Sequence, residues 1–258
     1  MNKFLYVGCG NHRLSGFTHV EIDFAKTFSK GDIVSSPEIM CDITDKIPLN
    51  DNSVDLIFSR ETYEHLKYRE LINCLIESHR VLKKGGLMRI GVPDLDKYIH
   101  NYIDKKEDVN KAKSEWHLDP DFPIENHSDL FVARIMYTDH YYNHNFETLS
   151  NALKNVGFSN ITRNKPGEID ISNQVIKGSI FEAENESKEF LLILTAQKTR
   201  ETSLLQKYSF KLPQSFLNRI LKKFFNLKLV PSNHRMTFFP QKTFFLEKIE
   251  KLKNLFKF

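Results

Sequence analysis

The fold is decided first by residues 4–23, which read FLYVGCGNHRLSGFTHVEID. The run from Phe4 to Val7 is aromatic and aliphatic and stops at glycines, which predicts a buried strand followed by a tight turn. A second strand is expected from Thr18 to Ile22, ending at Asp23. Only the seven residues 11–17 separate this strand from the turn. The stretch therefore predicts two strands joined by a short loop.

Strands and helices alternate through most of the chain. Further strands are expected at 38–41, 54–59, 87–92, 160–163 and 190–196, and amphipathic helices at 69–82 and 146–156. The cations and glycines of residues 83–86 are expected to end the first of these helices. Because strands that alternate with helices pair in parallel through right-handed crossovers, the pattern predicts an open α/β sheet. A helical insertion rich in His, Tyr and Asp, residues 94–145, is expected to cover the carboxyl ends of the strands, with one helix at 128–136.

Size and composition favour an ordinary globular protein. The chain has 258 residues, 40% of them hydrophobic and 27% charged, so a sizeable core is available. Cys9, Cys41 and Cys74 are far apart and form no CxxC pair, which argues against a disulfide framework or a structural zinc site. No apolar run approaches the eighteen or so residues that span a bilayer. These features predict a cytoplasmic protein.

The net charge of +4 is the sum of two oppositely charged parts. Residues 198–258 hold 14 Lys and Arg against three Glu, a net of +11, whereas residues 1–197 hold 23 against 30 acids, a net of −7. We therefore divide the chain into a domain, residues 1–197, and a basic C-terminal extension, residues 198–258.

The extension contains two amphipathic segments, residues 213–229 and 244–258, with apolar residues on one helical stripe and Lys elsewhere. Two helices packed on the domain would account for them. The alternative is a peripheral contact of residues 213–258 with the anionic inner face of a membrane. Nucleic acid is disfavoured because the acidic domain would repel it and no RNA-binding motif is present.

A nucleotide-type ligand is expected at the ends of the first strands. In the turn Gly8-Cys9-Gly10, two glycines let backbone amides approach a ligand where a Cβ would collide. Asp23, after the second strand, is placed to accept both hydroxyls of a ribose. Asp42, after the third strand, is placed near an adenine amine. The serial order of these groups at consecutive strand ends is hard to obtain by chance.

These segments resemble successive motifs of one family, the class I S-adenosylmethionine-dependent methyltransferases, over about residues 3–200. The matching segments are residues 5–10, 20–23, Asp42, 47–57 leading to 64–66, and 81–86. The resemblance implies a Rossmann-like three-layer sandwich, with a mostly parallel seven-stranded sheet whose last strand, near 190–198, is antiparallel; the extension would be helical. The cofactor implied is S-adenosylmethionine, bound by Gly8, Cys9, Gly10, Asp23, Asp42, Ser59 and His65.

One departure from the family is the short segment between the first two strands. Most members have a full helix there, whose N-terminus helps hold the ligand. In this chain the helix must be reduced to a turn. The shortness argues more strongly against NAD, because the third glycine of a GxGxxG motif would fall at Arg13 and no helix dipole remains for a pyrophosphate.

Methyl transfer from a sulfonium requires alignment and a dry pocket, and a base only when the acceptor must lose a proton. A neutral His would suffice for a hydroxyl acceptor. The candidates in the insertion are His117, His127, His140 and His144. We choose His127 and His140 as catalytic residues because they flank the helix expected at 128–136. Asp119, Asp121, His117 and His127 have irregular spacing that matches no ligand template, so no metal site is predicted.

The function predicted is methyl transfer to a small-molecule, sugar or lipid-linked glycan acceptor, by O-methylation. The resemblance is greatest to small bacterial members associated with surface-polysaccharide pathways. Two alternatives stay open: a catalytically silent module that binds cofactor or serves assembly, and an RNA methyltransferase. The sequence identifies neither the acceptor nor the oligomeric state.

Overall fold

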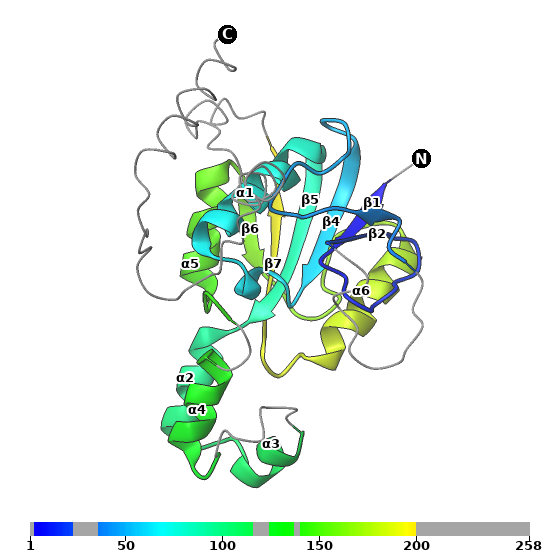
Figure 1. Cartoon of the computed structure of the whole chain (residues 1–258). Coiled ribbons are helices and arrows are strands. Elements are labelled where there is room, and N and C mark those ends of the chain that lie inside the picture. The colour runs from blue at the N-terminus through cyan, green and yellow to red at the C-terminus, as the bar shows by residue number, and fades with distance from the viewer. Residues whose placement is uncertain (1–2, 23–35, 116–123, 137–139, 200–258) are drawn as a thin grey trace, which may run out of the picture. The chain divides into compact units, whose positions relative to one another are not determined.

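The computed structural model describes residues 3–22, 36–115, 124–136 and 140–199 (Figure 1). In these residues, seven strands form one sheet in the order β3-β2-β1-β4-β5-β7-β6. The strands are β1 (Phe4–Val7), β2 (Thr18–Glu21), β3 (Ile39–Met40), β4 (Val54–Arg60), β5 (Leu82–Pro93), β6 (Ser159–Arg163) and β7 (Leu191–Gln197). Strand β7 runs antiparallel to both of its neighbours, and the other pairs are parallel. The predicted Rossmann-like α/β fold with an antiparallel last strand is confirmed.

The described helices lie around this sheet and in the insertion. They are the short 3-10 helix η1 (Tyr63–His65), α1 (Tyr68–Val81), α2 (Leu95–Asp104), α3 (Val109–Glu115), α4 (His127–Met136), α5 (Phe146–Val156) and α6 (Gln174–Glu186). The predicted helices at 69–82, 128–136 and 146–156 correspond to α1, α4 and α5. Helix α5 ends as expected at Gly157, whose φ of 106° suits a residue without a Cβ. No helix among the described residues is long and apolar enough to cross a membrane.

Alternation along the central strands divides the core between the two faces of the sheet. Leu5 and Val7 pack in one cluster with apolar residues of α1 and α5. Tyr6, between them, belongs to a second cluster with Ile176 and Ile180 of α6. Figure 1 shows α1 and α5 on one side of the sheet and α6 on the other. The sheet is therefore the middle of three layers, as predicted.

Helix α6 was missed in the sequence, and it occupies the face left bare by the short β1–β2 connection. Residues 11–17 form no helix, as predicted. Instead, α6 packs against this loop: Ser179 Oγ donates a hydrogen bond of 3.1 Å to the carbonyl of Ser15. A Cβ on Gly16 would lie 2.7 Å from Ile176 Cδ1, so the glycine permits this close approach. A helix from far along the chain thus completes the layer.

A buried ion pair fixes α6 to β5. The side chains of Arg89 and Glu184 have no exposed surface, and Arg89 Nε lies 2.6 Å from Glu184 Oε1. Arg89 also donates to the carbonyls of Lys165 and Glu168, at 3.0 Å each. The remaining carboxylate oxygen accepts from Gly167 N at 2.8 Å. Since both charges are paired and hydrogen-bonded, the loop before α6 and the helix are held in one arrangement.

Helix α1 ends at Val81, one residue before the predicted bound, but the strand predicted at 87–92 begins earlier than expected. Leu82 already pairs with Val54 as the first residue of β5. Gly85 has φ 85°, the left-handed backbone expected there, and the register shifts between Val54 and Leu56, which accommodates residues 83–86 as an irregularity of the strand. Gly85 N and Gly86 O are bonded to Lys198 at 2.7 and 3.0 Å. Residues 83–86 therefore follow the end of the helix, as predicted, and also belong to the next strand.

Candidate functional site

The turn after β1 is shaped by two glycines with left-handed backbone. Gly8 has φ 67°, and a Cβ there would lie 2.2 Å from Thr62 Cγ2. Gly10 has φ 48°, and a Cβ there would meet nothing within 4 Å. Gly8 thus lets the loop after β4 approach the turn, whereas Gly10 lies beside open space. A loop with open space over its backbone is what binding of a cofactor at this turn requires.

The acid that the structure places at the tip of β2 is Glu21. Its Oε2 accepts a hydrogen bond of 2.8 Å from the amide of Gly10, so the carboxylate lies directly beside the turn. Its Oε1 accepts from Ile22 N at 2.8 Å. Asp23, the predicted ribose ligand, lies outside the described residues. Sequence reasoning passed over Glu21, although it is the last residue of the strand and the strand end is where a ribose acid is expected.

Asp42 follows β3, as predicted, and stabilises the turn that begins there. Its Oδ1 accepts from Thr44 N at 2.9 Å and from Thr44 Oγ1 at 2.7 Å. The role predicted for Asp42 toward an adenine amine stays a prediction.

Cys9 and Ser59, two further predicted cofactor residues, have buried side chains. Both are only 1% exposed. Burial raises the pKa of the Cys9 thiol to about 11, so the side chain is neutral at physiological pH. Neither residue offers exposed surface to a cofactor in this structure, so their cofactor roles stay predictions.

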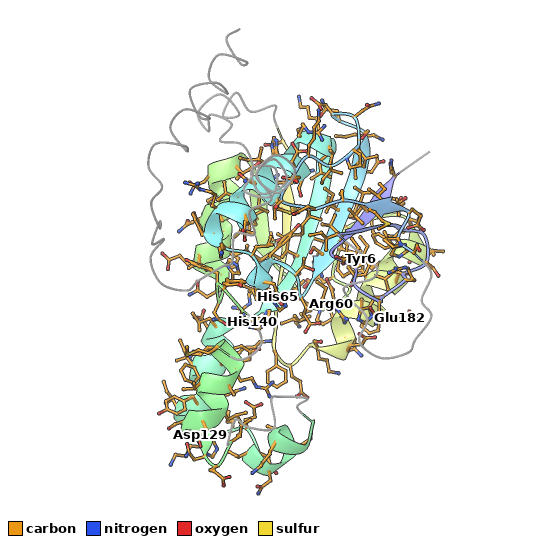
Figure 2. The ribbon with its side chains drawn as sticks, viewed as in Figure 1. Tyr6, Arg60, His65, Asp129, His140 and Glu182 are labelled. Carbon is orange, nitrogen blue, oxygen red and sulfur yellow. The ribbon has the colours of Figure 1, made fainter. Side chains whose placement is uncertain are left out.

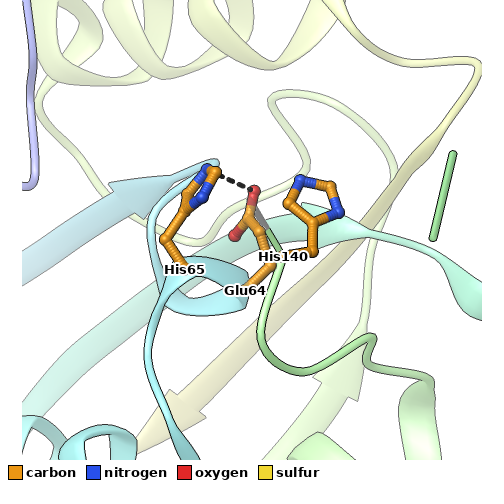
Figure 3. A group of neighbouring side chains, drawn as sticks. All are labelled: Glu64, His65 and His140. Carbon is orange, nitrogen blue, oxygen red and sulfur yellow. Dashed lines mark ion pairs between the residues drawn. The ribbon is translucent and has the colours of Figure 1, made fainter. Parts of the chain in front are cut away.

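A carboxylate and two imidazoles gather where β4 meets the end of the insertion. Figure 3 shows the carboxylate of Glu64 between the rings of His65 and His140. Glu64 Oε1 lies 4.0 Å from His65 Nε2, and the two ring centroids are 5.0 Å apart. The carbonyl of Glu64 accepts from Tyr141 N at 2.8 Å, which holds the chain next to His140 beside η1. Predicted residues from segments far apart in sequence, His65 and His140, are thus brought together.

Glu64 is the functional candidate that sequence reasoning missed at this place. Its side chain is 1% exposed, and burial raises its pKa to about 8. Neither carboxylate oxygen has a hydrogen-bond partner among the described residues. The signal in the sequence was an acid directly before His65, in a segment already matched to the family.

His127, the other predicted catalytic residue, has different surroundings from His140. It lines a pocket between the helices of the insertion, with Tyr98, Asn101, Tyr102, Glu107, Leu130, Phe131 and Arg134. Figure 2 shows Asp129, two residues further on, well away from His140 and His65. The reason is helical rise: α4 has ten residues, which span about 15 Å, and His127 is its first residue while His140 follows its last. The two were expected to face the cleft together, and the structure does not bring them together.

Of the other two histidines weighed as candidates, only His144 lies in the described residues. His144 is 1% exposed, and burial lowers its pKa to about 4. His117, Asp119 and Asp121, weighed as candidates in the sequence, lie outside the described residues, as do residues 200–258 of the basic extension.

Comparison with protein families gives one match, which covers the part of the chain that holds this site. Residues 5–90 match a family model described as a methyltransferase domain. The match runs from β1 into β5 and so includes the glycine turn, Glu21, Asp42 and the Glu64-His65 pair. No curated protein matches the sequence.

Solved structures with a similar fold are S-adenosylmethionine-dependent methyltransferases of low sequence identity. A Thermotoga maritima methyltransferase is 16% identical, with a TM-score of 0.43, over 77% of this chain and 83% of that one. A Methanosarcina mazei methyltransferase is 15% identical, with a TM-score of 0.43, over 78% and 93%. Phosphoethanolamine N-methyltransferase 2 of Haemonchus contortus, solved with S-adenosyl-L-methionine, is 16% identical, with a TM-score of 0.40, over 77% and 49%. Because these TM-scores are low, the fold assignment rests on the strand order described above.

Proposed function

We propose that the chain methylates an oxygen of a small-molecule, sugar or lipid-linked glycan acceptor. The proposal starts from residues 5–90, which match a methyltransferase domain, here of the class I, S-adenosylmethionine-dependent type. One observation carries the proposal: the glycine turn with Glu21 and the group Glu64, His65 and His140 both lie beside the loops that follow β1, β2 and β4. The glycine turn with Glu21 suits a nucleoside, and the group around Glu64 suits an acceptor hydroxyl that must lose a proton.

The residues at the turn fit the nucleoside part of the cofactor. Each oxygen of the Glu21 carboxylate accepts one backbone amide and keeps a further lone pair, which a ribose hydroxyl could occupy. The open space at Gly10 leaves room for a ligand beside this carboxylate. Asp42 remains the proposed residue for the adenine side. S-adenosylmethionine, when bound, supplies an electrophilic methyl group on sulfur, and it has no phosphate that a helix N-terminus would have to neutralise.

The group around His140 would activate the acceptor. A hydroxyl is a weak nucleophile until its proton is lost, and an imidazole within reach of the hydroxyl can accept that proton. His140 is the residue from the insertion that this group includes, so it is the predicted catalytic residue that we retain. His127 has no place in the proposal.

The ribose assignment is tested by isothermal titration calorimetry with S-adenosylhomocysteine on Glu21→Gln and Asp23→Asn. Gln keeps an oxygen for the amide of Gly10 but removes the charge and one acceptor for the ribose. We expect the first substitution to weaken binding at least about 10-fold, since hydrogen bonds to charged groups contribute about 1.5–3 kcal/mol. Loss of binding only in Asp23→Asn would return the assignment to Asp23. No binding by the unsubstituted protein would refute the proposed function.

For the acceptor, turnover is measured as release of S-adenosylhomocysteine with sugar nucleotides, glycolipids and small hydroxylic molecules. An RNA acceptor is included because it is the alternative within the same enzyme class. Activity on amines alone would overturn the proposed O-methylation.

We further propose that residues 213–258 bring the domain to an anionic membrane surface. The support is the net charge of +11 on residues 198–258, together with the apolar stripes of the two amphipathic segments.

A further inference from the structure

We propose that Glu64, His65 and His140 bind a divalent cation of the Zn²⁺ type. Each side chain offers one ligand atom, and these atoms all lie within 4.8 Å of one another. The site lies at the end of β4, where the proposed acceptor would be activated. The cation's role in catalysis therefore rests on the proposed function, whereas its binding does not.

The three side chains form a ligand set that Zn²⁺ prefers. Two imidazole nitrogens and one carboxylate oxygen are the protein ligands of many catalytic zinc sites. Because such ligands lie about 2.0–2.2 Å from the ion in a tetrahedral arrangement, two ligands of one ion are about 3.3–3.6 Å apart. The most widely separated ligand atoms must therefore approach each other by about 1.2–1.5 Å from the spread of 4.8 Å. His65 is 43% exposed and can make this adjustment by a small rotation.

Glu64 gives the second, independent indication of a cation. Its carboxylate is buried and has no hydrogen-bond partner among the residues that the structure describes. A buried carboxylate without a partner is costly, so the group either keeps its proton or pairs with a cation, and a metal ion bound by the two imidazoles is such a cation. The basic side chain that faces Glu64 is His65, whose Nε2 lies 4.0 Å from Glu64 Oε1 and which is charged only when protonated.

The backbone holds the two halves of the site together. Glu64 and His65 belong to η1, and the carbonyl of Glu64 accepts from the amides of Tyr141 at 2.8 Å and Tyr142 at 3.2 Å. The residue next to His140 is thus fixed to the residue that supplies the carboxylate. A site of this kind binds an ion with little reorganisation of the chain.

Three protein ligands leave a coordination position open for an oxygen of the acceptor. A hydroxyl bound there loses its proton to water more readily. The oxygen then forms its bond to the methyl carbon as the bond from that carbon to sulfur breaks, and S-adenosylhomocysteine leaves as a neutral thioether. In this scheme His140 acts as a ligand and not as a direct base.

The test is titration of the chelator-treated full chain with Co²⁺, followed by the visible absorption that Co²⁺ acquires in a protein site. We expect one Co²⁺ per chain for the unsubstituted protein, displaced by Zn²⁺. Glu64→Gln and His65→Ala should each weaken Co²⁺ binding at least about 10-fold, the lower range known for changes around a metal site. His100→Ala, a change at an exposed imidazole on α2, is the matched control and should bind as the unsubstituted protein does.

Thermal melts in chelator separate loss of the site from loss of the fold. If Glu64→Gln does not fold, His65→Ala decides, since His65 is partly exposed. The proposal is overturned if the unsubstituted protein gives no Co²⁺ absorption, or if both variants bind like the control. Activity that persists in chelator and depends on His140 would overturn the catalytic role and identify His140 as the base.

These outcomes are independent of the proposed function. S-adenosylhomocysteine binding is measured in chelator, without the cation. Cation binding without S-adenosylhomocysteine binding would refute the methyltransferase function alone, and the reverse result would refute the cation site alone.

Discussion

Gly8 shows how a single missing side chain shapes the turn after β1. A Cβ on Gly8 would lie 2.2 Å from Thr62, and φ is 67°. We expect Gly8→Ala to lower the free energy of unfolding by about 2–4 kcal/mol, from backbone strain and steric overlap together. Denaturant unfolding measures this change, and calorimetry with S-adenosylhomocysteine measures the accompanying loss of affinity.

Gly10→Ala is the matched control for this prediction. It has a similar backbone, with φ 48°, but open space where the methyl group would lie. We expect it to cost only about 1–2 kcal/mol, from strain alone. Equal losses for the two variants would show that Thr62 does not restrict position 8.

His144 predicts a pH dependence of stability. Burial lowers its folded-state pKa to about 4 from the ordinary histidine value of about 6.5, so the unfolded chain binds the proton more tightly. The stabilisation is therefore fully present above about pH 6.5 and is lost as the pH falls toward 4. The whole pKa difference between the folded and unfolded chain corresponds to about 3 kcal/mol of unfolding free energy, because one pKa unit is worth about 1.4 kcal/mol.

Unfolding free energies of His144→Gln and the unsubstituted protein at pH 7.5 and 5 test this dependence. We expect the variant to lose less stability between the two pH values than the unsubstituted protein does. His100→Gln, a change at an exposed position, should keep the original dependence. If the unfolding free energy of His144→Gln changed with pH as much as that of the unsubstituted protein, the lowered pKa of His144 would be contradicted.

Helix α6 covers the face of the sheet beside the short β1–β2 connection. Its apolar residues Ile176, Ile180 and Ala183 recur at helical spacing, so the signal was present in the sequence. What the sequence did not reveal is where this helix packs. Its partner is the sheet face beside residues 11–17, more than 150 residues earlier, and the contact between Ser179 and Ser15 documents that approach.

The Arg89–Glu184 pair is expected to decide whether α6 stays on the sheet. Glu184→Gln leaves a buried guanidinium without its countercharge, which costs about 3–5 kcal/mol. Urea unfolding measures the loss. The double variant Arg89→Met, Glu184→Met should be less destabilised than Glu184→Gln, because no charge remains buried.

Glu125→Gln, a change in an exposed ion pair, is the control for the buried Arg89–Glu184 pair. It removes the partner of Lys113 in an exposed pair, which is expected to cost less than about 1 kcal/mol. A loss in Glu184→Gln no larger than in Glu125→Gln would show that the buried pair does not anchor the helix.

The opposite charges of the two parts of the chain lead to a prediction about the whole protein. Sedimentation with anionic vesicles should be strong for the full chain at low salt and should decline as salt is raised. Replacing Lys222, Lys223, Lys248 and Lys251 by Gln should reduce pelleting severalfold, since each cation near such a surface contributes about 1 kcal/mol. Equal pelleting of both proteins, or equal pelleting with neutral vesicles, would contradict the membrane proposal.

Local patterns in the sequence determined the strands, the glycine turn and three of the six described α-helices, α1, α4 and α5. Alternation and helical spacing depend on neighbouring residues, which is why β1, β4, α1 and α5 were predicted close to their observed bounds. The early start of β5 at Leu82 was not predicted, because residues 85 and 86 bond to Lys198, more than 100 residues later.

Only the tertiary structure decided which predicted residues meet. It placed α6 over the bare face of the sheet, Glu21 beside Gly10, and Glu64 between His65 and His140, and it separated His127 from His140. The physical reason is that such contacts depend on the packing of layers and on the length of helices, and the spacing of residues along the chain does not record either.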